Sequence, residues 1–394
     1  MGRWHLHAAC LALLVAAWAP TCYSKRHLRL DSPLAAFTSK TAYGCPKHKV
    51  FNDPWVADNV AFTYAIVIKD GLGGQVTRMM GVYALAEAMG VRYVHSPLSC
   101  IGHIGGQPHW RNQSCDGIDP ADAAKMQRLS SFLSLANTTA ADTSSWAQEL
   151  FTKGSWLMLA NVTETALRLQ RPTVVRIEWV HNFLSDCPDL FFHVPAWRPS
   201  NPQPQPVDRQ GSSWLLDGSG SKRIVVHMRR GDVTSLTTKR ALPTSFYLNV
   251  VKQVIQVCDF LGLDYTVEWF TEAGSTAADH EDLLRVRREI PNLTVLLNSD
   301  ILWNWHQMAS ADVFVTSKSA YSMVPAVVNP NALIIRAPPA TVCKVSCQPS
   351  SWLLTEDFEG NLSQEALYYV RRRLSGDAAA AAQEQAAMRT VLQQ

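Results

Sequence analysis

Apolar and polar positions in the second half of the chain follow two periods, which predict alternating strands and helices. Short apolar runs between polar residues predict strands, and apolar positions three and four residues apart predict helices. The expected strands are 223–228, 265–270, 293–297, 313–316 and 332–335. The expected helices are 245–261, 279–290, 302–310 and 321–328. Strands separated by helices predict right-handed crossovers and a parallel, doubly wound α/β sheet.

The first half of the chain begins in the same way but soon loses its regularity. An apolar strand at 61–68, a Gly-rich turn at 69–75 and a helix at 76–88 lead to a second strand at 91–94. Between 99 and 173 we expect two amphipathic helical stretches among Gly, Asn and Ser clusters. This middle part is the least informative region of the sequence.

Proline, glycine and serine cluster between the two halves. The segment 195–221 has no periodicity, which is typical of a connector. We therefore predict the following organisation: a signal peptide or short signal anchor at 1–24, an N-terminal domain at 45–200, a linker at 201–221, a C-terminal domain at 222–350 and C-terminal helices at 351–394.

The N-terminal segment predicts entry into the secretory pathway, with the Golgi or ER lumen as the expected location. Its apolar run at 8–19 is shorter than the roughly 20 residues of a membrane-spanning helix and fits a signal peptide. A short uncleaved anchor, and hence membrane attachment, stays an alternative. A lumenal location is consistent with five predicted N-glycosylation sites: Asn112, Asn137, Asn161, Asn292 and Asn361.

Charge and cysteine content narrow the choice of function. The 394 residues include 36 Lys and Arg against 33 Asp and Glu, a balance that disfavours a nucleic-acid binder. The nine cysteines contain no Cys-x2-Cys pair, which disfavours a four-cysteine zinc site. Cys258 lies in an apolar helical stretch and is the expected free thiol. Up to three disulfides of open connectivity are expected among the cysteines in loop-like sequence: Cys45, Cys100, Cys115, Cys187, Cys343 and Cys347.

The sharpest chemical signal is the run His-Met-Arg-Arg-Gly-Asp at 227–232, where a predicted strand ends. Ligands of doubly wound sheets bind outside the carboxyl ends of the strands. Arginine suits a diphosphate because its planar guanidinium donates two charge-assisted hydrogen bonds at once. We therefore predict that Arg229 and Arg230 bind a ligand. The alternatives are Arg–Asp ion pairs at the strand end and an exposed Arg-Gly-Asp adhesion tripeptide; His227 alone is more typical of a hydrogen-bonded core residue.

Hydroxyl groups follow another predicted strand. Ser317, Ser319 and Ser322 lie between the strand 313–316 and the next helix, and a helix N-terminus favours anions. By themselves these serines are also typical N-caps. In register with Arg229 they predict a second wall of a diphosphate site.

The Gly-rich turn of the first half offers a further ligand contact. Gly71 and Gly73 lack the third glycine of a dinucleotide-binding loop, because Val76 stands there. A plain strand-to-helix turn, with glycines for backbone freedom, is the alternative.

These motifs together resemble the fucosyltransferases that use GDP-fucose. The run at 227–232 is similar to the donor-binding signature of the α1,2-type enzymes, with kinship to the α1,6- and protein O-fucosyltransferases. The segments 246–249, 270–272 and 300–322 also look like their counterparts in order. The turn at 70–75 resembles the Gly-x-Gly-Asn-Gln turn of these enzymes, but Gly74 stands where asparagine is expected.

The resemblance implies a GT-B-like fold, with two Rossmann-like domains facing a cleft. In this fold the C-terminal domain (222–350) would bind GDP-fucose and the N-terminal domain (45–200) would lie on the acceptor side. The resemblance also implies an inverting, metal-independent transfer of fucose to a glycan or protein hydroxyl. It implies the following donor-binding residues: Gly71, Gly73, Gly74, Gln75, His227, Arg229, Arg230, Ser317, Ser319 and Ser322. Arg229 would stabilise the leaving diphosphate, and Asp232, Glu272 and Asp70 are candidates for the base.

No cofactor or metal is expected, because the chain has no Asp-x-Asp carboxylate pair to hold a divalent ion on a nucleotide sugar. The missing asparagine leaves a catalytically inactive sugar-binding relative as an alternative. The acceptor and the linkage stay open.

Overall fold

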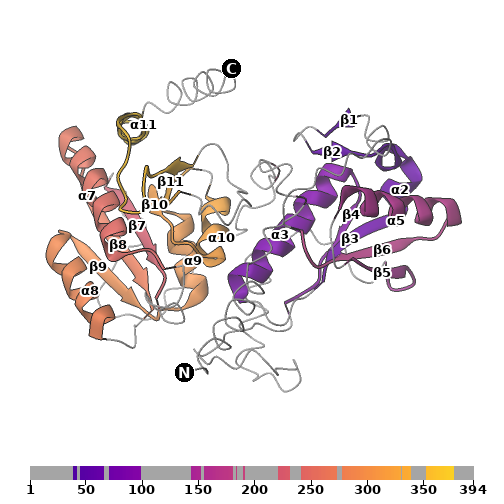
Figure 1. The fold of residues 1–394 in the computed structure, drawn as a ribbon, viewed down its shortest axis with the longest axis horizontal. Helices are drawn as coiled ribbons and strands as arrows, with labels where there is room; N and C mark the ends of the chain where they lie inside the picture. Colours follow the sequence, from indigo (N-terminus) through magenta and orange to yellow (C-terminus); the bar gives the residue numbers. More distant parts are fainter. Residues whose placement is uncertain are drawn as a thin grey trace, which may run out of the picture.

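The computed structural model of the chain describes two parallel β-sheets with helices packed on them, one sheet from each half of the sequence (Figure 1). The described residues are 39–41, 45–65, 71–98, 143–151, 155–180, 183, 190, 221–230, 241–272, 277–329, 331–338 and 352–376. This architecture confirms the predicted α/β class with two sheets. The predicted linker lies outside the described residues except for Ser221, so the domain boundary stays a prediction.

The C-terminal sheet has six parallel strands in the order β12-β11-β10-β7-β8-β9. The strands are β7 (Lys222–Met228), β8 (Tyr265–Thr271), β9 (Leu293–Leu297), β10 (Val313–Val315), β11 (Leu333–Arg336) and β12 (Leu353–Leu354). The chain runs outward from β7 to β9 and then returns to the other side of β7. Numbered along the chain, this is the Rossmann order 3-2-1-4-5-6, whose direction reverses between β7 and β10. The predicted doubly wound sheet is confirmed, and its five expected strands end within about one residue of the positions given by the pattern. Strand β12 was not expected, because 351–394 was predicted to be helical.

Helices cover both faces of this sheet. They are α7 (Thr244–Leu261), α8 (Ala277–Glu289), α9 (Ile301–Ala309), α10 (Ala320–Val328) and α11 (Gln364–Leu374). Alternate residues of β7 belong to two different cores: Ile224 and Val226 pack with α7 and α11, whereas Val225 packs with α9 and α10. Because both faces are buried, β7 is a nearly continuous apolar run, as is typical of parallel sheets.

The N-terminal sheet has four parallel strands in the order β4-β3-β6-β5. The elements after the short antiparallel pair β1 (Ser39–Lys40) and β2 (Pro46–Lys47) are η3 (Lys49–Asn52), α2 (Pro54–Asn59), β3 (Val60–Tyr64), α3 (Leu72–Met89), β4 (Arg92–Val94), β5 (Ala147–Phe151), α5 (Trp156–Leu169) and β6 (Thr173–Ile177). Strand β5 lies in the region 99–173 where helical stretches were expected, and β6, which begins where that region ends, was not predicted. The reversal of strand order here lies between β3 and β6.

Helix α3 corrects the prediction of a Gly-rich turn at 69–75. The helix begins at Leu72, so Gly73 and Gly74 belong to its first turn. Gly73 is needed for close approach: a Cβ there would lie 2.3 Å from the backbone nitrogen of Tyr321, in the first turn of α10. Alanine would otherwise favour the helix, so the glycine reflects packing rather than turn conformation.

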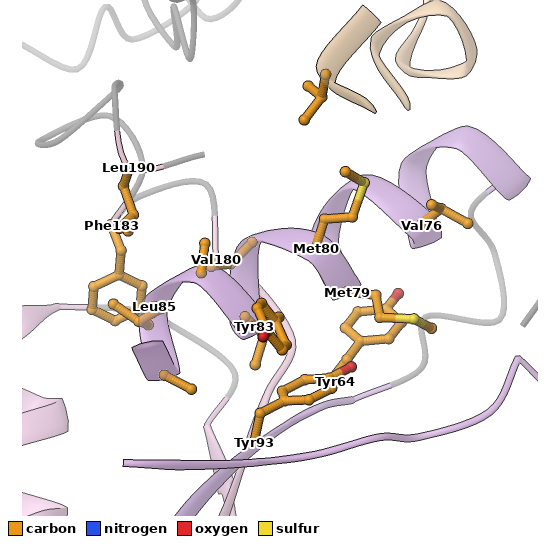
Figure 2. Close-up of a cluster of buried hydrophobic side chains, with 14 of the residues drawn as sticks. Tyr64, Val76, Met79, Met80, Tyr83, Leu85, Tyr93, Val180, Phe183 and Leu190 are labelled. Atoms are coloured by element: carbon orange, nitrogen blue, oxygen red, sulfur yellow. The ribbon is translucent and has the colours of Figure 1, made fainter. Parts of the chain in front are cut away.

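Helix α3 is buried on all sides and joins the two halves of the molecule. Figure 2 shows Met79 and Tyr83 directed toward Tyr64 and Tyr93 of the N-terminal sheet, while Met80 points the opposite way, toward the pale orange ribbon of the C-terminal half. Residues of α3 share one buried apolar cluster with α9 and α10. A helix that is apolar all round requires neighbours on every face, and here the two halves supply them.

The cysteine and sequon predictions are tested only in part. Cys258 is a buried free thiol, as predicted, and burial raises its pKa to about 11. Cys45 is buried and disulfide-bonded, and the other loop cysteines lie outside the described residues. Asn161, Asn292 and Asn361 are exposed, whereas the sequons at 112 and 137 lie outside the described part. Across the described ranges no helix is both long and apolar enough to cross a membrane.

Candidate functional site

The candidate site lies at the carboxyl edge of the C-terminal sheet, where the strand order reverses. Arg229 directly follows β7, and Ser317 follows the neighbouring strand β10. Parallel strands end at the same edge, so residues far apart in the sequence come together there. A reversal of strand order leaves a gap between the connections on the two sides, and such sheets bind ligands in that gap.

Three buried polar side chains form a closed network beneath this edge. The Nδ1 atom of His227 lies 2.7 Å from the Oγ of Ser322 and 2.9 Å from the Oγ of Ser317. The two serine oxygens are 2.8 Å apart, and the backbone N–H of Ser317 donates to Ser322 Oγ over 3.3 Å. The network ties the end of β10 and the start of α10 to β7.

The imidazole of His227 is neutral at physiological pH. Burial, and secondarily the positive charge of Arg229, lower its pKa to about 3. Its ring also packs on Tyr321, with centroids 4.9 Å apart. A neutral imidazole bonds to the serine hydroxyls without adding charge, so the positive charge beside this network comes from Arg229. A direct contact between His227 and a donor stays a prediction.

Arg229 lies beside the beginning of α10. Its Nη1 is 3.5 Å from the Oγ of Ser319, which caps the helix by accepting the N–H of Tyr321 over 3.2 Å. Arg229 is half-buried. A guanidinium and the positive end of a helix dipole therefore meet at one place, and both favour an anion.

Arg230 has a structural role instead. It is 4% exposed, and its Nη2 donates to Thr244 Oγ1 over 2.7 Å and to Asp282 over 3.3 Å. Its Nη1 donates to the carbonyl of Leu242 over 3.2 Å, and its Nε lies 3.8 Å from a carboxylate oxygen of Asp279. For Arg230, the alternative of Arg–Asp ion pairs at the strand end is therefore confirmed, and the residue joins β7 to α7 and α8. Its burial contradicts an exposed adhesion tripeptide, and the additional donor contact predicted for it stays untested.

The Gly-rich segment reaches the same place from the other half of the molecule. Gly71 precedes α3 without a side-chain cap, and Gly73 packs on the backbone of Ala320 and Tyr321. Gln75 is fully buried, and Gly74 is half-buried. The first turns of α3 and α10 thus touch. Because α3 follows β3 and α10 follows β10, the carboxyl edges of both sheets adjoin this contact.

Of the candidate bases, only Glu272 falls within the described residues. It is exposed and follows β8, the neighbour of β7 on the side away from β10. Asp70 and Asp232 lie outside the described part of the chain. Within that part, no group of three His, Cys, Asp or Glu side chains is arranged to hold a metal ion.

Sequence reasoning missed Lys318 and Arg336, two further cations at this edge. Lys318 follows β10, and Arg336 ends β11, its neighbour on the side away from β7. The Lys318 Nζ lies 3.9 Å from the centre of the Phe358 ring. Burial, and secondarily the charge of Arg336, lower its pKa. The position of Lys318 between Ser317 and Ser319 could have predicted a cation here, but the prediction rested on the serine hydroxyls alone.

The sequence matches no protein-family model and no curated protein. Among solved structures, the chain is similar to the E. coli ADP-heptose LPS heptosyltransferase II, with 15% identity, 83% of this chain and 99% of that chain covered, and a TM-score of 0.36. For E. coli heptosyltransferase WaaC with ADP-2-deoxy-2-fluoro heptose the identity is 10%, the coverage 81% and 99%, and the TM-score 0.36. For POFUT1 in complex with GDP the identity is 12%, the coverage is 69% of this chain and 94% of that chain, and the TM-score is 0.30. At these low scores the likenesses establish neither family nor activity.

The fold and site together define a two-sheet α/β protein in which Arg229 and the N-terminus of α10 meet at the reversal of its Rossmann-like sheet.

Proposed function

We propose that the protein is a glycosyltransferase that transfers fucose from GDP-fucose to a hydroxyl of a glycan or protein, with inversion and without a metal ion. The observation that supports this most is the meeting of Arg229 with the capped N-terminus of α10 at the reversal between β7 and β10. That arrangement suits a diphosphate. The choice of fucose and guanosine rests on the resemblance of the sequence motifs.

In the proposed reaction the acceptor oxygen forms a bond to C1 of fucose from the face opposite the diphosphate. The bond between C1 and the β-phosphate oxygen breaks, GDP leaves with the bonding electron pair, and the acceptor proton passes to a general base. Arg229 and the first turn of α10 would stabilise the charge that develops on the leaving diphosphate. Asp232, Glu272 and Asp70 remain the proposed bases, and Asp232 is the first to test because it adjoins the arginine run.

The proposed setting is the lumen of the Golgi or ER, with GDP-fucose and a glycan or glycoprotein acceptor as partners. The apolar run at 8–19 and the sequons support this setting, and N-glycans are proposed at all five. The N-terminal segment would serve either as a cleaved signal or as a membrane anchor.

The test is a donor panel with the secreted full chain. Release of the donor's own nucleoside diphosphate is measured for GDP-fucose, GDP-mannose, ADP-heptose and UDP-N-acetylglucosamine: GDP for the first two, ADP for the third and UDP for the fourth. Each donor is tested with and without a mixture of acceptor glycans and glycoproteins. We expect acceptor-dependent GDP release from GDP-fucose alone among these donors. GDP-fucose binding without release would favour the inactive sugar-binding relative, an alternative that the side-chain-free Gly74 supports. Release from a different donor would overturn the assignment of fucose.

A further inference from the structure

Trp179 occupies the position in the N-terminal sheet that corresponds to Ser317 in the C-terminal sheet, because each residue lies two positions after the strand on the later side of the reversal. It follows the carboxyl end of β6, and β6 and β3 are the two strands between which the strand order reverses. It is 41% exposed, the only tryptophan among the large apolar side chains that stand exposed in the described ranges. An exposed indole at such a position is a surface that a ligand can cover.

A buried arginine holds this indole in place. The guanidinium carbon of Arg78, on α3, lies 4.2 Å from the centre of the Trp179 ring, and Arg78 is only 7% exposed. Cation–π contact of this kind is strongest where the cation is shielded from water. Arg78 therefore covers one side of the indole and restricts its rotation, which leaves a rigid aromatic surface rather than a mobile side chain.

The proposed donor site and this surface both adjoin the N-terminal end of α3. Gly73, which contacts the start of α10, and Arg78 are both in the first two turns of α3. Their five-residue separation corresponds to about 7.5 Å along the helix axis. Both contacts are therefore at the N-terminal end of α3, although five residues turn the helix by about 140° and place them on different sides of it. An acceptor bound at Trp179 would have to be an oligosaccharide long enough to pass α3 and reach the edge of β7 and β10.

We propose that Trp179, positioned by Arg78, binds a pyranose ring of the acceptor and that the acceptor is therefore a glycan. One face of many pyranoses presents C–H groups, which pack on an aromatic ring and leave the hydroxyls at the rim for hydrogen bonds. This inference rests on the proposed function and names its acceptor class. A folded protein domain that offers a serine or threonine hydroxyl does not need such a platform.

The sheet supplies a matched control at its other edge. Trp146 lies just before β5 and packs with Arg92, the first residue of β4, with 5.8 Å between the guanidinium carbon and the ring centre. This pair has the same chemistry and belongs to the same sheet, but it is at the amino edge. A glycan-binding role should therefore distinguish Trp179 from Trp146.

The test measures oligosaccharide binding apart from transfer. The full chain, W179A, W179F and W146A are titrated with lactose, N-acetyllactosamine and chitobiose by saturation-transfer NMR, and GDP binding is measured by calorimetry. We expect W179A to weaken binding of at least one oligosaccharide by about tenfold or more, and W179F to retain affinity within about threefold. W146A should bind as the wild type does. GDP affinity should be equal in all four proteins.

Three results would overturn the inference: equal glycan affinity in W179A and wild type, equal losses in W146A and W179A, or no binding of any of these oligosaccharides by the wild type. Failure of the donor proposal has a different signature. In that case GDP does not bind and GDP-fucose is not consumed, while the loss of glycan affinity in W179A is still observed.

Discussion

The two sheets of this protein are built on one principle but differ in what they place at their carboxyl edges. The C-terminal sheet carries Arg229, Lys318 and Arg336 at the carboxyl ends of three adjacent strands, together with serine hydroxyls and the start of α10. The N-terminal sheet carries the aromatic Trp179 after β6. The edge of the C-terminal sheet therefore suits an anionic ligand, and the edge of the N-terminal sheet suits the apolar face of a ligand. The comparison suggests a division of labour in which one half binds the charged donor and the other binds the neutral acceptor.

The largest expected effect tests the charged edge. Arg229→Ala removes the guanidinium beside α10, and we expect transfer to fall by about a hundredfold or more, as for loss of a preorganised charge-stabilising donor. GDP release with acceptor present is the measurement. Arg288→Ala, an exposed arginine of α8, is the control and should leave the rate unchanged. Activity retained in R229A would mean that the donor lies elsewhere.

The next effect tests the junction between the two halves. Gly73→Ala places a methyl group against the backbone of Tyr321, which cannot give way as a flexible side chain does. We expect the free energy of unfolding to fall by about 1–3 kcal/mol. Urea denaturation of wild type and variant measures this. An unchanged midpoint would show that α3 and α10 do not pack closely in solution.

An effect of similar size concerns the buried imidazole of the C-terminal half. The pKa of His227 is lowered to about 3, so between pH 6.5 and pH 3 the unfolded chain binds a proton that the folded chain does not. Stability from this residue is complete above pH 6.5 and declines as the pH falls, by at most about 1.4 kcal/mol per pH unit.

The variant His227→Gln isolates this contribution. Its unfolding free energy should lose part of the acid dependence between pH 6.5 and pH 4 and should run parallel to that of the wild type between pH 7 and pH 8. Denaturant titrations across this range decide the matter. Parallel curves at every pH would contradict a depressed pKa for His227.

The smallest effect tests the aromatic edge through its support. Arg78→Lys keeps the positive charge but loses the planar group that stacks on Trp179. We expect a roughly threefold to fivefold rise in the KM for the acceptor glycan, which is under about 1 kcal/mol, with the KM for GDP-fucose unchanged. A purely structural role for Arg78 would instead change kcat and both KM values together.

The difference between the two halves also explains which features could be predicted from the sequence. In the C-terminal half, the spacing of apolar residues clearly separates strands from helices. The parallel, doubly wound sheet and the edge with Arg229 and Ser317 were therefore predictable. In the N-terminal half, β5 has the sequence Ala-Gln-Glu-Leu-Phe, which lacks a clear alternation and was not recognised as a strand. Trp179 had no signal of its own, because its importance depends on which strand precedes it and which neighbours that strand has.

Local sequence by itself determined five strands and four helices of the C-terminal half, the free thiol of Cys258 and the placement of cations and hydroxyls at strand ends, but not strand β12. These features depend on residues close together in the chain. Tertiary structure decided that Arg230 pairs with the carboxylates of α8, that His227 bonds to Ser317 and that Gly73 touches α10. Each of these contacts joins residues far apart in sequence. No local period encodes such partners, since they are set by how the two sheets and their helices pack.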